Sequence, residues 1–534
     1  MGGISRRTFL KTTAIGVAGL ASMGILGACS VDRGSKDGKD TEKTQVIRNP
    51  VRTEKCDMVV VGSGTAGLCA AVRGAELGGS VILLEKRSVT GGTSVFAEGI
   101  GGLNSYMHRN EGKEFDVNEA ARRCADYHHW ASDFACLQRF ISESGKTIDW
   151  LHESCGIEFW TATVTAPTSY PSWHLGATKD GEFAYLGESL IKPLEEYAKK
   201  LGVDLRLSNP ATGLIYKDGA VKGVYVEDKK KKEEYAIEAE AVVLATGGYA
   251  NNKELFEEFT GLNYDEILNY GQPDGRDGDG IRWAREIGAA LHFPGAVMFG
   301  FPAVPGVKIF QDKVNFLFSL QPTLRVNERG LRFFNEAHHT DFGQTGNTLI
   351  AQTKVFSIMD QSYLEHLQNK SVLTGYDLAG YPSGKPWPEA GEVMKKAIEN
   401  GQAYKFDTVE QLANHIGCDG KTLQETLDKY NEACDNGKDV EFNKPAEFLL
   451  PIRTAPYYVA QLQQTMFTTV GGLRVDEYWR VTNKEGKPIP GLFALGNDAS
   501  SIYGHDYDVG IMSGSQQGWA ATGGRLVAEY VFGK

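Results

Sequence analysis

Short apolar runs that end in glycine-rich turns recur along this chain. Residues 58–61 (MVVV) are an uninterrupted apolar run, which is the pattern of a strand buried on both faces of a parallel sheet. The next residues, 62–67 (GSGTAG), are typical of a tight turn that opens a helix. Residues 80–85 (SVILLE) form a second apolar run. This order predicts a strand, a turn, a helix and a second strand of the same parallel sheet.

The same alternation returns far along the chain. Residues 238–252 (EAEAVVLATGGYANN) predict a strand that ends in glycines, and residues 278–291 predict the start of a helix. Near the end, residues 490–498 (PGLFALGND) predict a strand and residues 513–531 a final helix. Pieces of one α/β fold therefore lie at both ends of the sequence.

The middle of the chain has a different pattern. Residues 408–417 (TVEQLANHIG) and 421–437 (KTLQETLDKYNEACDNG) predict helices. Residues 293–307 (FPGAVMFGFPAVPGV) are rich in aromatic and apolar side chains, which would suit either the wall of a substrate cavity or the core of a separate domain. The basic run Lys229–Lys232 lies between two strand-like stretches and predicts a solvated hairpin turn.

Length, charge and cysteines narrow the class of protein. A chain of 534 residues is too long for one core and predicts two or three domains. The net charge of -12 argues against nucleic-acid binding, which needs a basic face. The 63 glycines exceed the usual share of about 7% and cluster in short motifs, as in nucleotide-binding proteins. No C-x-x-C or ferredoxin-like run occurs among the 8 cysteines, so no covalent haem, iron–sulfur cluster or other metal site is predicted.

Residues 1–29 predict a targeting signal rather than part of the fold. Ser5–Lys11 (SRRTFLK) is a twin-arginine export signal, and the apolar stretch 14–28 is too short to span a membrane comfortably. The stretch closes with LGAC, the pattern of a bacterial lipoprotein cleavage site, so we expect a lipid anchor at Cys29; the alternative is an incidental cysteine of a cleaved signal peptide. Residues 30–53 predict a flexible tether. The expected location is the outer side of the cytoplasmic membrane.

Three glycines and an acidic residue predict a dinucleotide site. Gly62, Gly64 and Gly67 form G-x-G-x-x-G between the first predicted strand and its helix. Glycines permit a tight turn and the close approach of a pyrophosphate to the amides at the start of the helix. Glu85 closes the second strand, where its carboxylate can hold ribose hydroxyls.

These motifs, in this order, resemble those of the fumarate reductase and succinate dehydrogenase flavoprotein superfamily over about residues 54 to 534. The resemblance implies an α/β fold: a Rossmann-like FAD-binding domain of the glutathione-reductase type (54–292 and 447–534), interrupted by an α+β capping domain (293–446). It also implies FAD, bound non-covalently because the loop TGGTSVFAEG lacks the attachment histidine of the respiratory complexes. The residues it places around FAD are Gly62, Gly64, Thr65, Ala66, Gly67, Glu85, Lys86, Gly92, Thr93, Ser94, Thr246, Gly247, Asp279, Gly471, Gly472 and Asn497.

Three segments depart from the fumarate reductases that they resemble. In those enzymes an Asn-Glu pair is followed by two variable residues and then Thr-Arg-Asp, whose arginine protonates fumarate; here Thr340 occupies the arginine's place. The segment TTVGG, which begins at Thr468, replaces HTMGG, whose histidine binds a substrate carboxylate. Residues 503–514 (YGHDYDVGIMSG) replace HGANRLGG and lack its arginine. Because guanidinium groups are the usual clamps for dicarboxylates, fumarate is not the expected substrate.

The segment GNDASSIYGHDY instead resembles the 3-ketosteroid Δ1-dehydrogenase branch, in which a tyrosine polarises the substrate ketone. Tyr507 falls on that tyrosine, although the following DVGIMSGS departs from that branch's AGPG loop. The first candidates for the proton donor are His338 and His339, which lie where the family keeps its acid. We expect this pair in an extended segment, with the two side chains on opposite sides. The alternative donors are Tyr503, His505 or a water.

Together these features predict an exported, membrane-anchored reductase. It would transfer a hydride from flavin N5 to a C=C bond conjugated to a carbonyl, in an enone or enoate. Electrons would come from an external donor, a membrane-bound multihaem cytochrome, since no second dinucleotide motif is visible. Two alternatives stay open: a 3-ketosteroid dehydrogenase that runs in the oxidative direction, and a tethered flavoprotein that only carries electrons.

Overall fold

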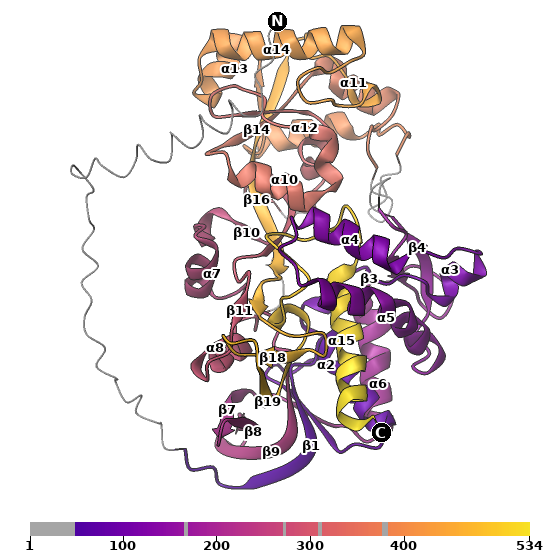
Figure 1. Ribbon diagram of the computed structural model, residues 1–534. Coiled ribbons are helices and arrows are strands. Elements are labelled where there is room, and N and C mark those ends of the chain that lie inside the picture. Colours follow the sequence, from indigo (N-terminus) through magenta and orange to yellow (C-terminus); the bar gives the residue numbers. More distant parts are fainter. Residues whose placement is uncertain (1–47, 165–168, 271–273, 308–311, 376–382, 534) are drawn as a thin grey trace, which may run out of the picture. The chain divides into compact units, whose positions relative to one another are not determined.

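A sheet of eight strands holds the N-terminal and C-terminal parts of the chain together (Figure 1). The computed structural model describes residues 48–164, 169–270, 274–307, 312–375 and 383–533. The predicted signal 1–29 and most of the predicted tether lie outside these residues. Across the residues described, no helix has both the length and the apolar character that crossing a membrane requires.

The centre of this sheet is parallel, as the apolar runs predict. Strand β1 (Thr53–Val61) pairs in parallel with β2 (Val81–Glu85) and with β9 (Glu233–Leu244). Strand β19 (Pro488–Ala494) joins the other side of β9, also in parallel. Residues 58–60 of β1 are completely buried, which explains why this strand carries no polar side chain at its carboxyl end.

The rest of the sheet extends these four strands. The sheet has the order β18-β19-β9-β1-β2-β6, with β8 also paired to β9 and β7 paired to β8. The added strands are β6 (Asp204–Leu207), β7 (Ala211–Lys217), β8 (Ala220–Asp228) and β18 (Arg480–Thr482). Strands β8 and β9 form an antiparallel hairpin whose turn holds Lys229–Lys232, so the predicted solvated turn is confirmed.

Helices from both ends of the sequence pack on this sheet. Helix α2 (Thr65–Glu76) lies beside the final helix α15 (Ser515–Phe532), and Arg73 of α2 forms an ion pair with Glu529 of α15 at 3.0 Å (Figure 1). The other helices of this part are α3 (Tyr106–Asn110), α4 (Val117–Tyr127), α5 (Phe134–Glu153), α6 (Lys192–Lys200), α7 (Lys253–Thr260) and α8 (Asp279–Glu286).

A second sheet of six strands belongs mainly to the predicted cap. Its longest strand, β16 (Tyr457–Thr469), pairs through its first half with β14 (Val355–Asp360) and β15 (Tyr404–Phe406). The second half of β16 pairs with β10 (Leu268–Asn269) and β12 (Val297–Ala303). One strand therefore continues from the cap toward the first sheet. Strand β13 (Leu324–Asn327) completes the sheet at the edge of β14.

Helices surround this second sheet. They are α9 (Val314–Phe318), α10 (Phe342–Ile350), α11 (Gln361–Asn369), α12 (Ala390–Glu399), α13 (Val409–Ile416) and α14 (Gly420–Asn436). Helices α13 and α14 are the two that the sequence predicts in the middle of the chain. Thr408 and Asp419 cap them by accepting bonds from backbone amides at 3.2 and 2.8 Å, which explains where each helix begins.

Smaller elements connect these parts. Strands β3 (Gly99–Gly101), β4 (Phe159–Thr163) and β5 (Trp173–Gly176) form a small antiparallel sheet, and β11 (Leu291–His292) pairs with β17 (Gly472–Leu473). The short helical turns η1 (Gly92–Phe96), η4 (Glu336–Thr340) and η7 (Gly496–Asp498) carry residues of the candidate site.

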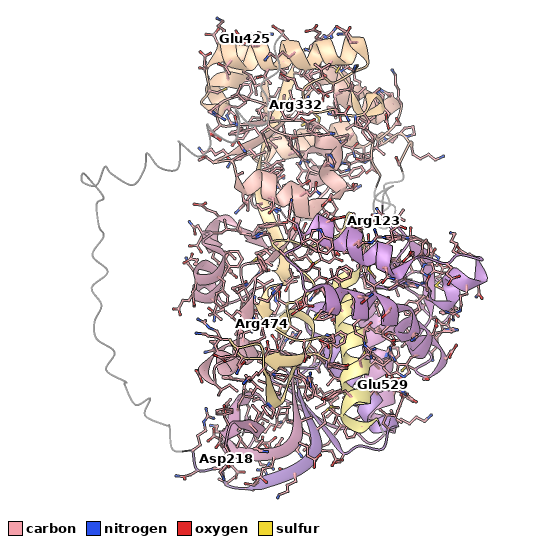
Figure 2. The ribbon with its side chains drawn as sticks, in the orientation of Figure 1. Arg123, Asp218, Arg332, Glu425, Arg474 and Glu529 are labelled. Atoms are coloured by element: carbon pink, nitrogen blue, oxygen red, sulfur yellow. The ribbon has the colours of Figure 1, made fainter. Side chains whose placement is uncertain are left out.

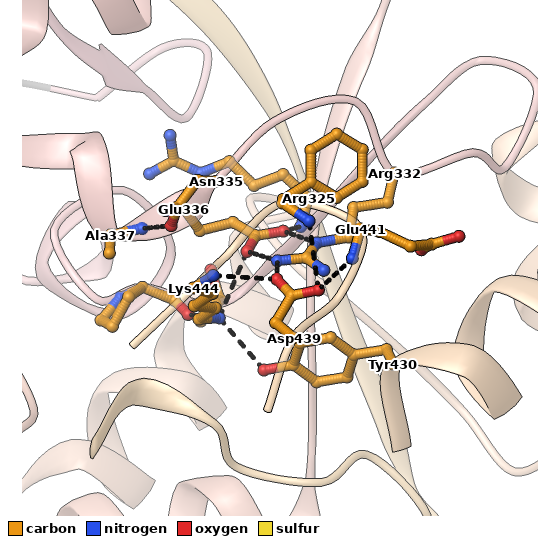
Figure 3. Close-up of polar contacts among 12 residues, drawn as sticks. Arg325, Arg332, Asn335, Glu336, Ala337, Tyr430, Asp439, Glu441 and Lys444 are labelled. Carbon is orange, nitrogen blue, oxygen red and sulfur yellow. Dashed lines mark hydrogen bonds and ion pairs between the residues drawn. The ribbon is translucent and has the colours of Figure 1, made fainter. Parts of the chain in front are cut away.

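A buried network of charges holds the cap together around Arg332 and Glu336 (Figures 2 and 3). The two side chains make two hydrogen bonds of 2.8 Å each, and Lys444 Nζ lies 3.3 Å from Glu336. Arg332 also forms an ion pair with Asp439 at 2.7 Å. The Asn-Glu motif of the sequence is thus part of a structural network, because the carboxylate of Glu336 is paired with Arg332 and Lys444 of the cap.

Candidate active site

The first glycines of the chain shape a cradle at the carboxyl ends of β1 and β9. Gly62 has φ +105°, and a Cβ there would lie 2.2 Å from the carbonyl oxygen of Ala245. A Cβ on Gly67 would lie 1.9 Å from the oxygen of Gly62. Gly64 has ordinary space around it and caps α2 without a side chain, although the first amide of the helix, Thr65 N, donates to Ser94 Oγ at 3.2 Å.

Glu85 lies at the rim of this cradle in a fixed position. Its carboxylate accepts bonds from Ser63 N (3.1 Å), Ser63 Oγ (2.7 Å) and Arg87 N (2.9 Å), and the side chain is buried. The neighbouring Lys86 makes ion pairs with Asp277 (2.8 Å) and Asp279 (2.7 Å). These contacts hold the Glu85 carboxylate and the ion-paired Lys86 at the end of β2, where the ribose hydroxyls of a dinucleotide would bind.

The cradle opens into a cavity of about 910 Å³, which includes space that is open to solvent. The predicted residues that line it are Gly62, Gly64, Thr65, Ala66, Glu85, Lys86, Gly92, Thr93, Ser94, Thr246, Gly247, Asp279 and Asn497.

Three predicted glycines are absent from the lining of this cavity. Gly67 packs against Gly62, as described above. A Cβ on Gly471 would lie 2.1 Å from the oxygen of Phe293, and one on Gly472 would lie 2.7 Å from the oxygen of Asp498. These three positions therefore need glycine for the close approach of two backbones.

Several lining residues were missed by the sequence reasoning. They are Arg87, Asn209, Arg276, Trp283, Gln516 and Gln517. The last two stand at the start of the predicted final helix, and that position next to a glycine-rich turn was the available signal. Asp498 was also missed: it is fully buried and accepts bonds from Gly248 N (2.9 Å) and Thr246 Oγ1 (2.8 Å), which fixes the turn after β9.

The polar atoms of the cavity suit FAD. Four buried oxygens that face it, Thr65 Oγ1, Thr93 Oγ1, Gln516 Oε1 and Gln517 Oε1, have no hydrogen-bond partner among the residues described. Leaving such a buried atom unpaired costs about 1–3 kcal/mol. Two hydroxyls that can donate and two amide oxygens that can accept match a ligand with phosphates, a polyol chain and a ring edge with an N–H group. The cavity therefore fits the cofactor that the motif predicts.

Asn497 links the cavity to the strand that comes from the cap. Its Nδ2 donates to Thr468 Oγ1 at 2.8 Å, and its Oδ1 accepts a bond from Gln516. Thr468 is the residue that stands in place of the carboxylate-binding histidine of fumarate reductases. Its hydroxyl is used to fix Asn497, so this position offers no cation to a substrate.

Tyr503 and Tyr507 converge on the start of α15. The Tyr503 hydroxyl and Ser515 Oγ are 2.9 Å apart, and the ring centroids of the two tyrosines are 5.9 Å apart. The Tyr507 phenol interacts with Ser515 and with the backbone amides of Gly514 and Gln516. Burial raises the pKa of both tyrosines, and Asp508 adds to the rise, so both stay protonated and able to donate at neutral pH.

The three candidate histidines lie elsewhere. His338 is exposed and His339 is buried, and both belong to the turn η4; the expectation of an extended segment is wrong. Burial, with the charge of Arg325, lowers the pKa of His339 to about 3, so its imidazole is neutral. His505 is exposed and packs edge-to-face on Phe293 at 4.9 Å. In the described part of the chain, none of the three has a hydrogen bond or ring contact to Tyr503 or Tyr507.

Aromatic rings adjoin the tyrosine pair. Phe342 at the start of α10 stacks on Tyr507 with centroids 6.0 Å apart, and it contacts Phe301 (5.2 Å) and Phe467 (5.6 Å) edge-on. Phe467 directly precedes Thr468, which holds Asn497 of the cavity. Aromatic rings therefore surround the tyrosine pair, and the polar groups at this place are the two phenols, Ser515 and Asp508.

Comparison with known proteins shows the family to which this chain belongs. The family described as "FAD binding domain" matches residues 57–510. The chain is 32% identical over 477 residues to the vinyl phenol reductase of Lactiplantibacillus plantarum, covering 88% of this chain and 94% of that protein. It is 27% identical to the fumarate reductase (cytochrome) of Shewanella frigidimarina, covering 92% of this chain and 79% of that protein.

A solved structure has the same fold. The 3-ketosteroid Δ1-dehydrogenase of Sterolibacterium denitrificans, in complex with 1,4-androstadiene-3,17-dione, superimposes with a TM-score of 0.73 at 22% identity. The superposition covers 90% of this chain and 99% of that chain. The prediction of an α/β FAD-binding fold is therefore confirmed.

Proposed function

This chain belongs to the FAD-binding domain family, and we propose that it reduces a C=C bond in an aromatic substrate, where the bond is conjugated to a carbonyl or phenol oxygen. As a member of that family it is an FAD-dependent oxidoreductase that acts on C=C bonds. Our proposal adds the class of substrate and the direction of the reaction.

The observation that carries the proposal is the chemistry around the tyrosine pair. The residues that meet at the start of α15 are two phenols, a serine and the carboxyl group of Asp508, and aromatic rings adjoin them. The sequence between Asn497 and Ser515 contains no arginine or lysine. A site of this kind suits an uncharged ring system, because a dicarboxylate would lose its hydration without gaining a cation in exchange.

Tyr507 provides the electrostatic help that such a reduction needs. When bound and reduced, FAD supplies the hydride. In an enone or enoate, negative charge develops on the carbonyl oxygen as the hydride adds. In a vinyl phenol, the alkene must be protonated first to give a quinone methide, and the charge then develops on its oxygen as the hydride adds. A protonated phenol held at a helix N-terminus stabilises that charge by donating a hydrogen bond, and the amides of Gly514 and Gln516 fix the phenol in place. The same group of hydroxyls, Tyr503, Ser515 and Tyr507, holds the proton that completes the reduction.

The relative from Lactiplantibacillus plantarum supports the choice of an aromatic substrate. That protein is a vinyl phenol reductase, and the match covers most of both chains. In a vinyl phenol the double bond is conjugated to a phenol oxygen through the ring. We therefore include aryl alkenes with a conjugated hydroxyl beside the enones and enoates that the sequence predicts.

We also propose that the enzyme works outside the cytoplasm on electrons from a separate protein. The twin-arginine signal at residues 5–11 and the lipobox that ends at Cys29 support export and a lipid anchor. The electron donor would be a membrane-bound multihaem cytochrome. Both statements rest on the sequence alone.

Anaerobic turnover with a reduced viologen dye tests the substrate class. The panel is a vinyl phenol, an aryl enone, an aryl enoate, a 3-ketosteroid and fumarate. We expect dye oxidation with the aryl substrates and little with fumarate. Faster turnover of fumarate than of every aryl substrate would refute the proposal. No turnover of any alkene, with an unchanged flavin spectrum after addition of each, would favour the electron carrier.

A further inference from the structure

A buried cluster of three aspartates and one histidine lies beside the tyrosine pair. Its members are Asp341, Asp506, Asp508 and His128, and none is more than 8% exposed. His128 directly follows α4, Asp341 caps α10, and the other two belong to the segment between β19 and α15. We call these four residues the acid cluster. None of them was a candidate from the sequence.

His128 stands between two of the aspartates. Its Nδ1 lies 3.8 Å from Asp506 Oδ1, and its Nε2 lies 3.8 Å from Asp508 Oδ2. Both ring nitrogens are buried and make no hydrogen bond within the described ranges. Hydrogen bonds of catalytic groups are often long in a free enzyme and tighten when the substrate binds. The two ring nitrogens therefore face one carboxyl group each.

The inner end of the cluster reaches the tyrosines. Ser515 Oγ donates to Asp508 Oδ1 at 2.6 Å and is 2.9 Å from the Tyr503 hydroxyl. The phenol of Tyr507 also interacts with Ser515. The Cys124 thiol of α4 faces Asp508 too, although burial raises its pKa so far that it stays protonated. A series of groups with exchangeable protons therefore leads from Asp506 through His128, Asp508 and Ser515 to the hydroxyls of the two tyrosines.

The outer end of the cluster reaches the cap. Asn347 of α10 donates to Asp506 Oδ2 at 2.7 Å, and Tyr127 of α4 donates to Asp341 Oδ1 at 2.8 Å. The exposed His338 lies near enough to act on the charge of Asp341. His338 and Asn347 are both exposed, so the outer side of the cluster lies next to surface residues of the turn η4 and of α10.

Charges in the cluster favour the storage of a proton. Burial raises the pKa of Asp506 to about 6; His128 opposes the rise, while Asp341 and Asp508 add to it. Burial also raises the pKa of Asp341, against the hydrogen bonds from Gln344 and Tyr127 and the charge of His338. Carboxylates this close cannot all ionise without a large cost, so the cluster titrates as a unit.

We propose that the acid cluster is the proton pathway of the reduction, with Asp506, His128 and Asp508 passing a proton to Ser515 and the tyrosine pair. This inference rests on the proposed function. Each reduced C=C bond gains one hydride, from reduced FAD, and one proton, from a tyrosine hydroxyl. The tyrosine recovers its proton through Ser515 from Asp508, which is resupplied through His128 from Asp506, and Asp506 takes its proton from water. The protein ends in its starting state.

The adjacent residues His128 and His129 provide a matched test, because His129 is exposed and lies outside the cluster. The dye-reduced holoenzyme is mixed with an aryl substrate in H₂O and in D₂O, and flavin reoxidation is followed. We expect His128→Gln to slow reoxidation by roughly 10²-fold, with a larger solvent isotope effect, as for a lost acid–base group. Flavin reduction by the dye and the affinity for a substrate analogue should not change. His129→Gln should match the wild type.

Asn347→Ala provides a second test that leaves every titrating group in place. Its hydrogen bond lowers the pKa of Asp506, so its loss raises that pKa. The rate of reoxidation, which requires protonated Asp506, falls as pH rises through that pKa. The midpoint of the pH profile should therefore move to higher pH in Asn347→Ala.

The outcomes separate the two proposals. If the wild type reduces an aryl alkene but His128→Gln keeps its rate and isotope effect, or Asn347→Ala keeps its pH midpoint, the proton pathway is refuted and the proposed function stands. If the wild type reduces no alkene, the proposed function fails first. Loss of FAD or unfolding in His128→Gln leaves the pH profile of Asn347→Ala as the deciding measurement.

Discussion

Replacing Glu336 by glutamine tests whether the Asn-Glu motif stabilises the cap. Glu336 is fully buried and accepts two hydrogen bonds of 2.8 Å from Arg332, while Lys444 approaches it to 3.3 Å (Figure 3). In Glu336→Gln, Arg332 keeps its ion pair with Asp439 at 2.7 Å. Lys444, which is buried, keeps only the oxygen of Pro322 and the Tyr430 hydroxyl.

The expected loss of stability follows from that uncompensated cation. Removing one partner of a buried ion pair costs about 3–5 kcal/mol, whereas an exposed pair contributes about 0–1 kcal/mol. Glu441 provides the matched control, because it is exposed and lies 3.5 Å from Lys429. We expect Glu336→Gln to lower the free energy of unfolding of the cap by about 3–5 kcal/mol and Glu441→Gln by less than about 1 kcal/mol.

Urea unfolding of the holoenzyme, followed by circular dichroism, measures both values. The pH dependence adds a second criterion. Burial opposes ionisation of Glu336, but Lys444 and Arg332 outweigh it and hold its pKa below the ordinary 4.5. A folded pKa below the unfolded value means that the stabilisation is complete above that value and is lost as pH falls through the folded pKa. Glu336→Gln should therefore flatten the acid limb of the stability curve. Equal stability of the two glutamine variants would refute the reasoning.

Four further predictions follow from the site and the sequence. Tyr507→Phe should slow reduction of the alkene about a hundredfold or more with FAD still bound, as measured by single turnover. His339→Gln should lower the thermal stability of the cap while the rate is kept, and His338→Gln should change the rate little; a loss of rate of roughly 10²–10⁴ at either position would return that histidine to the role of acid. Acid precipitation of the yellow holoenzyme should leave FAD in the supernatant, since the attachment is non-covalent. Lysines in place of both arginines of SRRTFLK should hold the precursor in the cytoplasm, and Cys29→Ala should release the mature protein from membranes in fractionation.

The FAD cradle could be predicted from sequence because its requirements are local. Gly62 needs a positive φ and Gly67 needs the absence of a Cβ, and both follow from one turn between a strand and a helix. The two sheet strands on either side of that turn are apolar runs of ordinary length. The single stretch of residues 58–87 thus contributes 10 of the 29 residues that line the cavity.

The conformation of the histidine pair could not be predicted from the sequence. Asn335 accepts a bond from Ala337 N at 2.9 Å and starts a tight turn, while Arg332 holds Glu336 inside the cap. That turn replaces the expected extended segment and directs His339 inward, beside Arg325. The conformation depends on a partner, Asp439, that lies about a hundred residues away in the sequence and also binds Arg332. No local pattern could indicate it.

The acid cluster was beyond prediction for the same reason. His128 comes from a segment without a motif, and Asp341 and Asp506 lie in segments whose resemblance to the family gives these two aspartates no role. Only the packing of α4 and α10 on the segment before α15 unites the three residues. An isolated aspartate in a loop is an ordinary surface residue in a sequence. Its chemistry changes only when burial removes water from it.

The absence of an arginine from residues 503–514 is connected to the acid cluster, because a neighbouring cation would change the pKa of its carboxyl groups. A guanidinium beside a carboxyl group would favour the ionised carboxylate and lower its pKa. Within residues 503–514 there is no such group, and the cation-forming side chain nearest to Asp506 and Asp508 is His128, 3.8 Å from each. Burial therefore raises the pKa of Asp506 to about 6, so that this carboxyl group can hold a proton in mildly acidic solution. Under the proposed function, the same absence of a cation that suits an uncharged substrate leaves a carboxyl group that can store a proton, whereas a neighbouring arginine would lower its pKa. Asn347→Lys would place such a cation next to Asp506. It should lower the pKa of Asp506 and move the fall of the reoxidation rate to lower pH.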